Sequence, residues 1–153
     1  MIGVTVKASI DPVKLATGLK DAIRKKALRK ALRPAAEPTL QAAKNNTPRR
    51  YGFLKRSLSK KIKVGRSGNG FAVVGPRSKL VYVRGVVTRG KHKGQPIRHR
   101  PSFYMHLVNK GSKRSRAYHN LDSAITTGGR QFSMILAARL KQEITAELNK
   151  LAK

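Results

Sequence analysis

The chain has 153 residues, of which 39% are hydrophobic, and its 35 lysine and arginine residues against 6 aspartate and glutamate residues give a formal net charge of +29. This length suits one domain, 1–153, and the apolar content is too high for a disordered tail. The absence of cysteine excludes a disulfide framework and a thiolate metal site, and no apolar run approaches the length that spans a membrane.

The positive charge is concentrated in the middle of the chain. No acidic residue lies between Glu37 and Asp122, whereas 21 of the 35 basic residues lie from Lys44 to Arg116. A field of this size repels other copies of the protein unless a polyanion or an acidic protein surface compensates it. Because nucleic acid is the most common polyanion, the composition indicates a nucleic-acid or acidic protein partner.

The N-terminal part is expected to form a strand and a long helix. Apolar and polar residues alternate over residues 2–8, which is the pattern of a half-buried strand. Asp11 and Pro12 are typical of an N-cap and a first helical position, and apolar residues then recur at helical spacing up to Leu32. Pro34 and Pro38 should kink or restart this helix, because each removes a backbone donor.

The segment TPRRYGFLKRSLSKKIKV, residues 47–64, follows the end of this helix at about residue 46. Pro48 should end the helix, and Gly52 should permit a sharp corner. Tyr51 and Phe53, or the leucine after it, are expected to fix the corner by packing. The segment is therefore predicted to be a structural joint that displays cations.

The next part of the chain is predicted to be rich in β-structure. Residues 58–64 and 71–74 flank a glycine-rich turn and should form a hairpin that ends at Gly75-Pro76. Lys61 and Lys63 alternate with apolar residues of the first strand, so we expect both lysines on the exposed face. Residues 80–87, LVYVRGVV, form a further β-rich run.

Two basic segments follow this run. Residues 88–102 contain one isoleucine as their only large apolar side chain, and a mobile basic loop is predicted over about 84–102. Residues 103–108 should form a short buried element, either helix or strand. Residues 110–120 are predicted to be a second basic loop.

The C-terminal part, from about Leu121 to Lys153, has the apolar periodicity of a helix, and Gly128-Gly129 is expected to break off its first turn. Glu143 and Glu147 should lie on an exposed face and pair with Lys141 and Lys150. The order of elements predicts an α+β fold, with a small, mostly antiparallel sheet packed with a long N-terminal and a long C-terminal helix.

The sequence lacks the patterns of common catalytic sites. Its carboxylates form no motif, and its four histidines lie in the basic region without neighbouring acids. No phosphate-binding glycine loop is present. We therefore expect no enzymatic activity, no metal and no cofactor. Phe71, Tyr82 and Phe103 lie in apolar runs and are expected in the core, which favours phosphate contact over base stacking.

Three stretches of the sequence together resemble a known family. Residues 36–38 are an Ala-Glu-Pro step within a basic, Ala/Leu-rich helix. A second motif, Pro-Arg-Arg/Lys-Thr-Gly-x-Leu-x-x-Ser, is matched at Pro48, Arg49, Arg50, Gly52, Leu54 and Ser57, with Tyr51 in place of the threonine. A third, Tyr-x-x-x-Val-Glu-x-Gly-Thr, is matched at Tyr104, Val108 and Gly111, with Asn109 for the glutamate and Ser112 for the threonine. These motifs, with a closing helix of similar character, resemble the tail-completion (neck) family of long-tailed phages, which are head–tail joining proteins.

The sequence departs from this family in two places. Residues 116–118 only faintly match the family's Pro-Phe-Leu-Arg-Pro segment, and residues 84–102 have the character of an insertion. The resemblance implies a virion protein that is assembled in the host cytoplasm and forms or joins a homo-oligomeric ring at the head–tail junction or upper tail. It implies other neck and tail subunits as partners, and no catalysis, membrane or small-molecule substrate.

The cations expected to contact DNA or neighbouring subunits lie at the corner, on the first hairpin strand and in the first basic loop. They are Arg49, Arg50, Lys55, Arg56, Lys61, Lys63, Arg84, Arg89, Lys91, Lys93, Arg98 and Arg100. The alternative hypothesis is a ribosomal-protein-like or other basic nucleic-acid-binding module, which the charge and the segment RGKHKGQPIRHR also suit. Such a module should bind nucleic acid with an affinity that falls steeply with salt.

Overall fold

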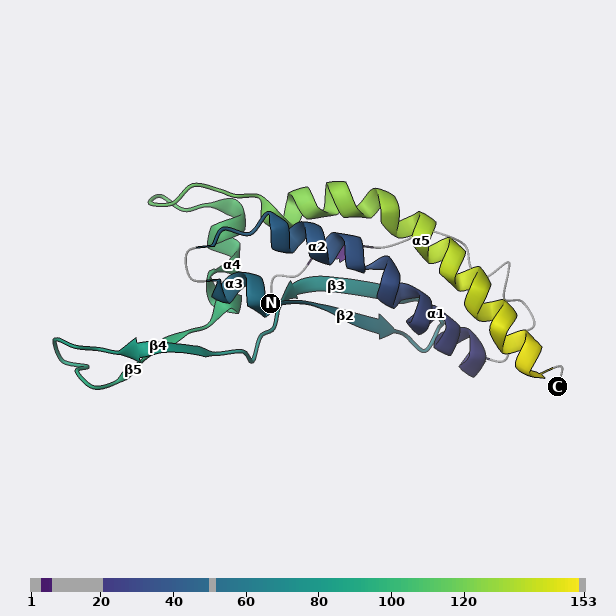
Figure 1. Ribbon diagram of the computed structural model, residues 1–153, viewed down its shortest axis with the longest axis horizontal. Coiled ribbons are helices and arrows are strands. Elements are labelled where there is room, and N and C mark those ends of the chain that lie inside the picture. Colours follow the sequence, from purple (N-terminus) through teal and green to yellow (C-terminus); the bar gives the residue numbers. More distant parts are fainter. Residues whose placement is uncertain (1–3, 7–20, 50–51, 152–153) are drawn as a thin grey trace.

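The computed structural model describes residues 4–6, 21–49 and 52–151. In chain order these form β1 (Val4–Val6), α1 (Asp21–Ala35), α2 (Glu37–Asn45), α3 (Phe53–Ser57), β2 (Leu58–Val64), β3 (Gly70–Pro76), β4 (Tyr82–Val86), β5 (Pro96–His99), α4 (Pro101–Lys110) and α5 (Asn120–Leu151). Figure 1 shows an elongated molecule with the long helices beside a small sheet and the β4–β5 hairpin extending from one end. The predicted α+β fold is confirmed.

The main sheet has three strands in the order β1-β3-β2, and both pairings are antiparallel. β2 and β3 form the predicted hairpin, which begins with Leu58 opposite Pro76. Successive side chains of each strand point to opposite faces of the sheet. Leu58 and Val74 are buried on the side of the helices, whereas Lys61 and Lys63 are exposed, as predicted.

Helices α1 and α2 are separated by a turn at Ala36. Pro34 lacks a backbone N–H within α1, and Pro38 stands in the first turn of α2, where a missing donor is tolerated. The predicted kink or restart is therefore confirmed. The helix start predicted at Asp11 lies outside the described residues.

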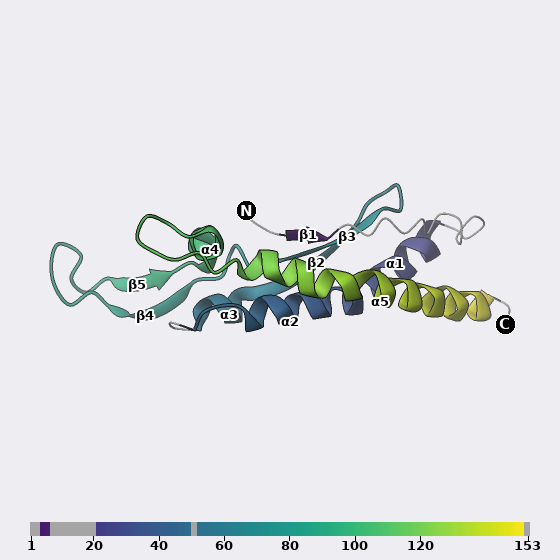
Figure 2. The same ribbon diagram turned by 90° about the horizontal axis from the view of Figure 1, so that it is seen from above.

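Two hydrophobic clusters hold the helices to the sheet, and α5 contributes to both. The first joins α1, β3 and α5 and includes Leu32, Ala72 and Phe132, each almost fully buried. The second joins α2, α3, the sheet, α4 and the start of α5, and includes Met105 and Leu121. Because α5 runs along the whole helical layer, it links the two clusters (Figures 1 and 2).

Helix α5 is continuous from Asn120 to Leu151, so the predicted break at Gly128-Gly129 is wrong. The structure gives Gly128 a packing role instead. It is buried against α2, and a Cβ atom at this position would lie 2.5 Å from the Cα atom of Thr39. A glycine is needed here because two helix backbones approach closely, and surrounding contacts offset its low helix propensity.

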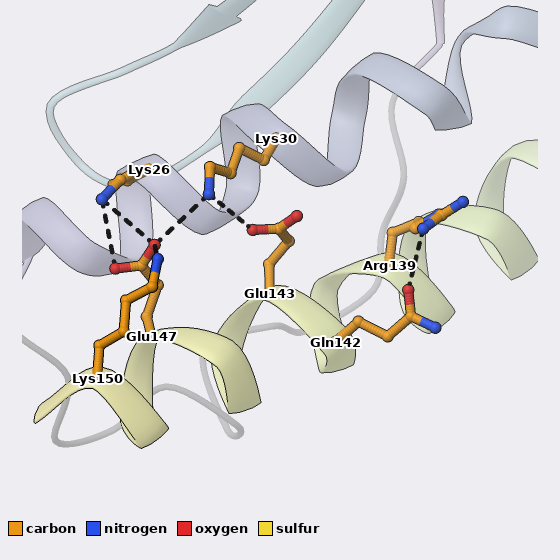
Figure 3. Close-up of polar contacts among 7 residues, drawn as sticks. All are labelled: Lys26, Lys30, Arg139, Gln142, Glu143, Glu147 and Lys150. Carbon is orange, nitrogen blue, oxygen red and sulfur yellow. Dashed lines mark hydrogen bonds and ion pairs between the residues drawn. The ribbon is translucent and has the colours of Figure 1, made fainter. Parts of the chain in front are cut away.

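An ion-pair cluster fixes α5 against α1 (Figure 3). The Glu147 carboxylate lies 3.3 Å from Lys26 Nζ and 3.5 Å from Lys30 Nζ of α1, and 3.6 Å from Lys150 Nζ. Glu143 lies 3.1 Å from Lys30 Nζ. The pairing of Glu147 with Lys150 was predicted, but the exposed setting was wrong, because Glu147 is only 6% exposed and faces α1.

These contacts shift the pKa values of the cluster. The hydrogen bond from Lys26 holds the pKa of Glu147 below its usual value, against the opposing effect of burial. The hydrogen bond to Glu143 raises the pKa of Lys30 above its usual value. Both shifts favour the charged forms, so the cluster stabilises the helical layer when all of its members are ionised.

The segment predicted as a mobile loop over 84–102 is largely a β-hairpin, so that prediction is wrong. β4 and β5 pair antiparallel, and the ladder continues through Val87 N–H to Gln95 O at 2.9 Å. Gly90 and Gly94 adopt φ values of +82° and +85° in the turn between the strands. Backbone pairing builds this hairpin, which explains why its apolar pattern is weak.

Residues 103–108 lie in helix α4, one of the two alternatives predicted. The helix is only partly buried, because Phe103 is 66% exposed and Leu107 is also exposed, although Met105 is fully buried. The expectation of a core position for Phe103 is therefore wrong. The connector 111–119 contains no helix or longer strand, only an isolated bridge between Ser112 and Ser115.

Candidate interaction surfaces

The joint predicted at residues 47–64 is present and contains an additional helix. Thr47 Oγ1 donates to the Ala43 carbonyl at 2.6 Å at the end of α2, and Gly52 adopts φ +71° before α3. Leu54 is buried in the second cluster, as expected for a residue that fixes the corner. The short helix α3 was not predicted, and Tyr51 lies outside the described residues.

Four cations surround the corner. Arg49, Lys55 and Arg56, which were predicted as contact residues, line an open hollow of about 500 Å³ together with Lys44 and Gly52. Lys44 was missed because its sequence position assigns it to the preceding helix, and only the fold turns it toward the corner. Arg50 lies outside the described residues. The hollow has the charge to bind phosphate or carboxylate groups.

A second basic surface is the outer face of the sheet. Lys61 lies opposite Val73 and Lys63 opposite Phe71 in the β2–β3 register. Both lysines are exposed, and Lys63 Nζ lies 5.9 Å from the centre of the half-buried Phe71 ring. This face therefore combines cations with apolar surface.

The third surface is the arm, defined as residues 81–100, which comprises the β4–β5 hairpin and its flanks. All the cations predicted there are exposed: Arg84, Arg89, Lys91, Lys93, Arg98 and Arg100. The arm also exposes aliphatic side chains whose exposure was not predicted from the sequence: Val81, Val83, Val86 and Ile97. Val83 and Arg98 are cross-strand partners and therefore share one face of the hairpin.

Aromatic contacts attach the base of the arm to the body. The Phe53 ring of α3 stacks on Tyr82 of β4, with centroids 4.8 Å apart and planes inclined by 12°. Phe53 also contacts His99 of β5, with centroids 5.4 Å apart. An apolar pocket of about 400 Å³ adjoins these rings and is lined partly by Tyr104 and Tyr118. Burial raises the pKa of Tyr104, as expected for a phenol at an apolar wall.

Four carboxylates are paired away from these three surfaces. Glu37 pairs with Lys60, Asp122 contacts His119 and Asn109, and Glu143 and Glu147 pair across the helical layer. The Lys60 hydrogen bond lowers the pKa of Glu37, and burial opposes this shift. These four carboxylates therefore lie away from the corner, the sheet face and the arm, and those three surfaces present cations.

Within the described ranges, no three histidine or acidic side chains lie close enough to hold a metal ion. The same part of the chain contains no helix that is both long and apolar enough to cross a membrane.

Comparison with known proteins assigns the class of protein. Residues 14–111, more than half of the chain, match the HK97-gp10-like family, described as "Bacteriophage HK97-gp10, putative tail-component". The chain belongs to this family of phage tail structural components, and the predicted resemblance to a phage tail family is confirmed. No curated protein and no solved structure matches the chain.

The third motif of the resemblance forms a structural joint in the fold. Asn109 Oδ1 accepts a hydrogen bond from Leu121 N–H at 3.0 Å, at the start of α5. Gly111 adopts φ +79°, and a Cβ there would lie 2.9 Å from Ala117 N. Val108 O accepts from Tyr118 N–H at 2.9 Å. These residues therefore position the connector and the start of α5.

Proposed function

We propose that this tail component acts at the phage neck or upper tail, in tail completion or head–tail joining, as a subunit of a homo-oligomeric ring. The observation that carries the proposal is that this member of the family pairs Glu143 and Glu147 within its helical layer and presents cations at the corner, the sheet face and the arm. The helical layer, with these ion pairs, suits contacts between copies, whereas the basic surfaces suit DNA or acidic neighbouring subunits. The role is assembly, without catalysis.

We propose that residues 1–153 act as one domain in this assembly. The support is that α5 belongs to both hydrophobic clusters, so the two ends of the body share one helix. A single cooperative unfolding transition, with the same midpoint by circular dichroism and by fluorescence of a dye attached at the corner, would agree with this. Two separated transitions would contradict it.

Mass photometry of the purified protein, alone and with the other neck and tail proteins of its phage, tests the ring. We expect a discrete oligomer, formed alone or with those partners. A protein that remains monomeric under both conditions, and that is absent from purified particles, would overturn the proposal.

The corner supports non-specific DNA contact. Arg49 and Arg56 are exposed beside the hollow, so the double substitution Arg49→Ala/Arg56→Ala should weaken binding to short duplex DNA while leaving the fold intact. The slope of log affinity against log salt should decrease by about 1 for each phosphate group that the variant no longer neutralises. Arg139→Ala is the matched control, because Arg139 lies on α5 beside Gln142, away from the corner (Figure 3).

A nucleic-acid-binding module remains the second candidate, and the basic arm and corner are what favour it. The same titrations separate the two functions. Tight duplex or RNA binding by a protein that never enters particles would favour the module, whereas particle incorporation with weak, salt-sensitive DNA binding favours the tail component.

A further inference from the structure

The arm is attached to the body at its base. Its two strands pair with each other, and its aromatic contacts with Phe53 of the body involve Tyr82 and His99, the residues at the foot of the hairpin. In both ribbon views the hairpin extends beyond the end of the main sheet (Figures 1 and 2). A two-stranded hairpin is marginally stable by itself, so an arm of this kind gains order from a surface that it lies against.

The exposed side chains of the arm favour a protein surface over DNA. Val83 is 61% exposed and Val86 is 56% exposed, and Val81 and Ile97 add to the apolar area. Phosphate groups are bound by cations, amides and hydroxyls and make no use of aliphatic side chains. A protein interface buries such residues at its centre and places charged residues at its rim. The arm has this composition, with aliphatic residues on strands that also carry Arg84 and Arg98.

The charge of the arm favours a different protein over a second copy of this chain. The cations of the arm need carboxylates opposite them, and like charges across an interface are strongly unfavourable. The carboxylates of Glu37, Asp122, Glu143 and Glu147 are already paired within their own chain, and Glu147 is buried as well. Among the described side chains, these four carboxylates of a second copy therefore offer the arm little complementary charge.

We propose that the arm binds a different virion protein, on a surface where an aliphatic strip is bordered by aspartate and glutamate residues. This inference rests on the proposed function, because it assigns the arm to a partner in the same particle. Val83 and Val86 fill the strip, and Arg98, the cross-strand partner of Val83, reaches the acidic border. Copies of this chain contact one another through the helical layer of α1, α2 and α5 and form the proposed ring. The arm extends from this ring to the neighbouring protein.

Two sets of variants test the apolar and the charged parts of the arm. Val83→Ser/Val86→Ser removes exposed aliphatic groups, and Arg98→Glu reverses one charge. Leu107→Ser is the matched control, because Leu107 is 41% exposed but lies on α4, outside the arm and outside the helical layer of α1, α2 and α5. Each variant complements a phage that lacks the gene, and quantitative mass spectrometry measures the copies per purified particle. Circular dichroism establishes that each variant is folded.

We expect the arm variants to lower incorporation on the order of tenfold, as for the removal of interface residues, and the control to leave it unchanged. Val83→Ser/Val86→Ser should bind short duplex DNA like the wild type. If the valine variant enters particles normally, or if it loses affinity for DNA, the arm inference is overturned. If the wild-type protein is itself absent from particles, the proposed function fails. If the wild-type protein is present and the valine variant enters particles equally well, only the arm inference fails.

A photo-crosslinking amino acid at position 83 identifies the occupant in assembled particles. The expected product joins this chain to a different virion protein at a peptide beside acidic residues. A product that joins two copies of this chain, or joins the arm to DNA, would overturn the inference. The same amino acid at position 107, on α4, controls for chance proximity.

Discussion

At the scale of single residues, the two adjacent glycines of α5 have opposite roles. Gly128 faces Thr39 of α2, whereas a Cβ at Gly129 would meet only Ile125 Cγ2 at 3.9 Å, an ordinary contact. Gly128→Ala should therefore lower the free energy of unfolding by about 1–3 kcal/mol, because the helix backbones must separate. Gly129→Ala should raise it by up to about 1 kcal/mol through helix propensity. Urea denaturation of both variants checks this difference, and equal effects would contradict the close approach.

The ion-pair cluster of Glu147 makes stability depend on pH. A carboxyl group with a lowered pKa in the folded state contributes stability above its unfolded value of 4.5, and loses it as the pH falls through the folded value. Lys30 behaves in the opposite sense, because its raised pKa contributes below 10.5 and is lost as the pH rises further. The melting temperature of Glu147→Gln should therefore fall less than that of the wild type between pH 5 and pH 3. Parallel curves for the two proteins would show that Glu147 does not titrate with folding.

The packing role of Gly128 and the ion pairs of Glu147 with α1 were not predictable from the sequence, because their partners lie far away along the chain. Lys26 and Glu147 are 121 positions apart, so local spacing paired Glu147 with Lys150 on its own helix instead. The role of Gly128 could not be predicted for the same reason, since the residue that it contacts, Thr39, lies on another helix. Local sequence patterns suggested an exposed setting for Glu147 and a helix break at Gly128, and both suggestions were wrong. Only the packed fold shows a buried cluster or a close backbone approach.

At the scale of elements, the arm depends on Phe53 for its position. The Phe53 ring stacks on Tyr82 and contacts His99, one residue from each strand of the arm. Phe53→Ala should therefore increase amide hydrogen exchange across residues 82–99 on a scale of tenfold or more, while α1 and α5 retain their protection. Met134→Ala is the control, because that side chain is exposed on α5, away from the arm. Unchanged exchange in the arm after Phe53→Ala would contradict the anchoring role.

The elements that were predicted correctly have strong local signals. The β2–β3 hairpin follows from the alternation of Leu58, Ile62 and Val64 with lysines before a glycine-rich turn, and the α1–α2 break follows from Pro34 and Pro38. β5 was missed because Ile97 is its only large apolar residue and backbone pairing with β4 defines it. A strand that is defined by backbone pairing has little apolar alternation in its sequence, so the basic composition of residues 88–102 suggested a loop.

At the scale of the whole molecule, the family and the α+β class were accessible from the order of the motifs, although the third motif proves to be a scaffold around Asn109 and Gly111. The charge excess and the acid-free middle of the chain were evident from the sequence, but the partners of the acidic side chains in the fold were not. Folding pairs Glu37, Asp122 and the two glutamates of α5 away from the corner, sheet face and arm, and it places aliphatic residues among the arm's cations.

Cryo-electron microscopy of purified particles tests the central claim, that this family member is a ring-forming structural subunit of the neck or upper tail. We expect a ring of density at that position into which the α1–α2–α5 layer and the three-stranded sheet fit, with the basic surfaces toward DNA or acidic subunits. Particles that contain no copies of the protein, or copies scattered without a ring, would contradict it.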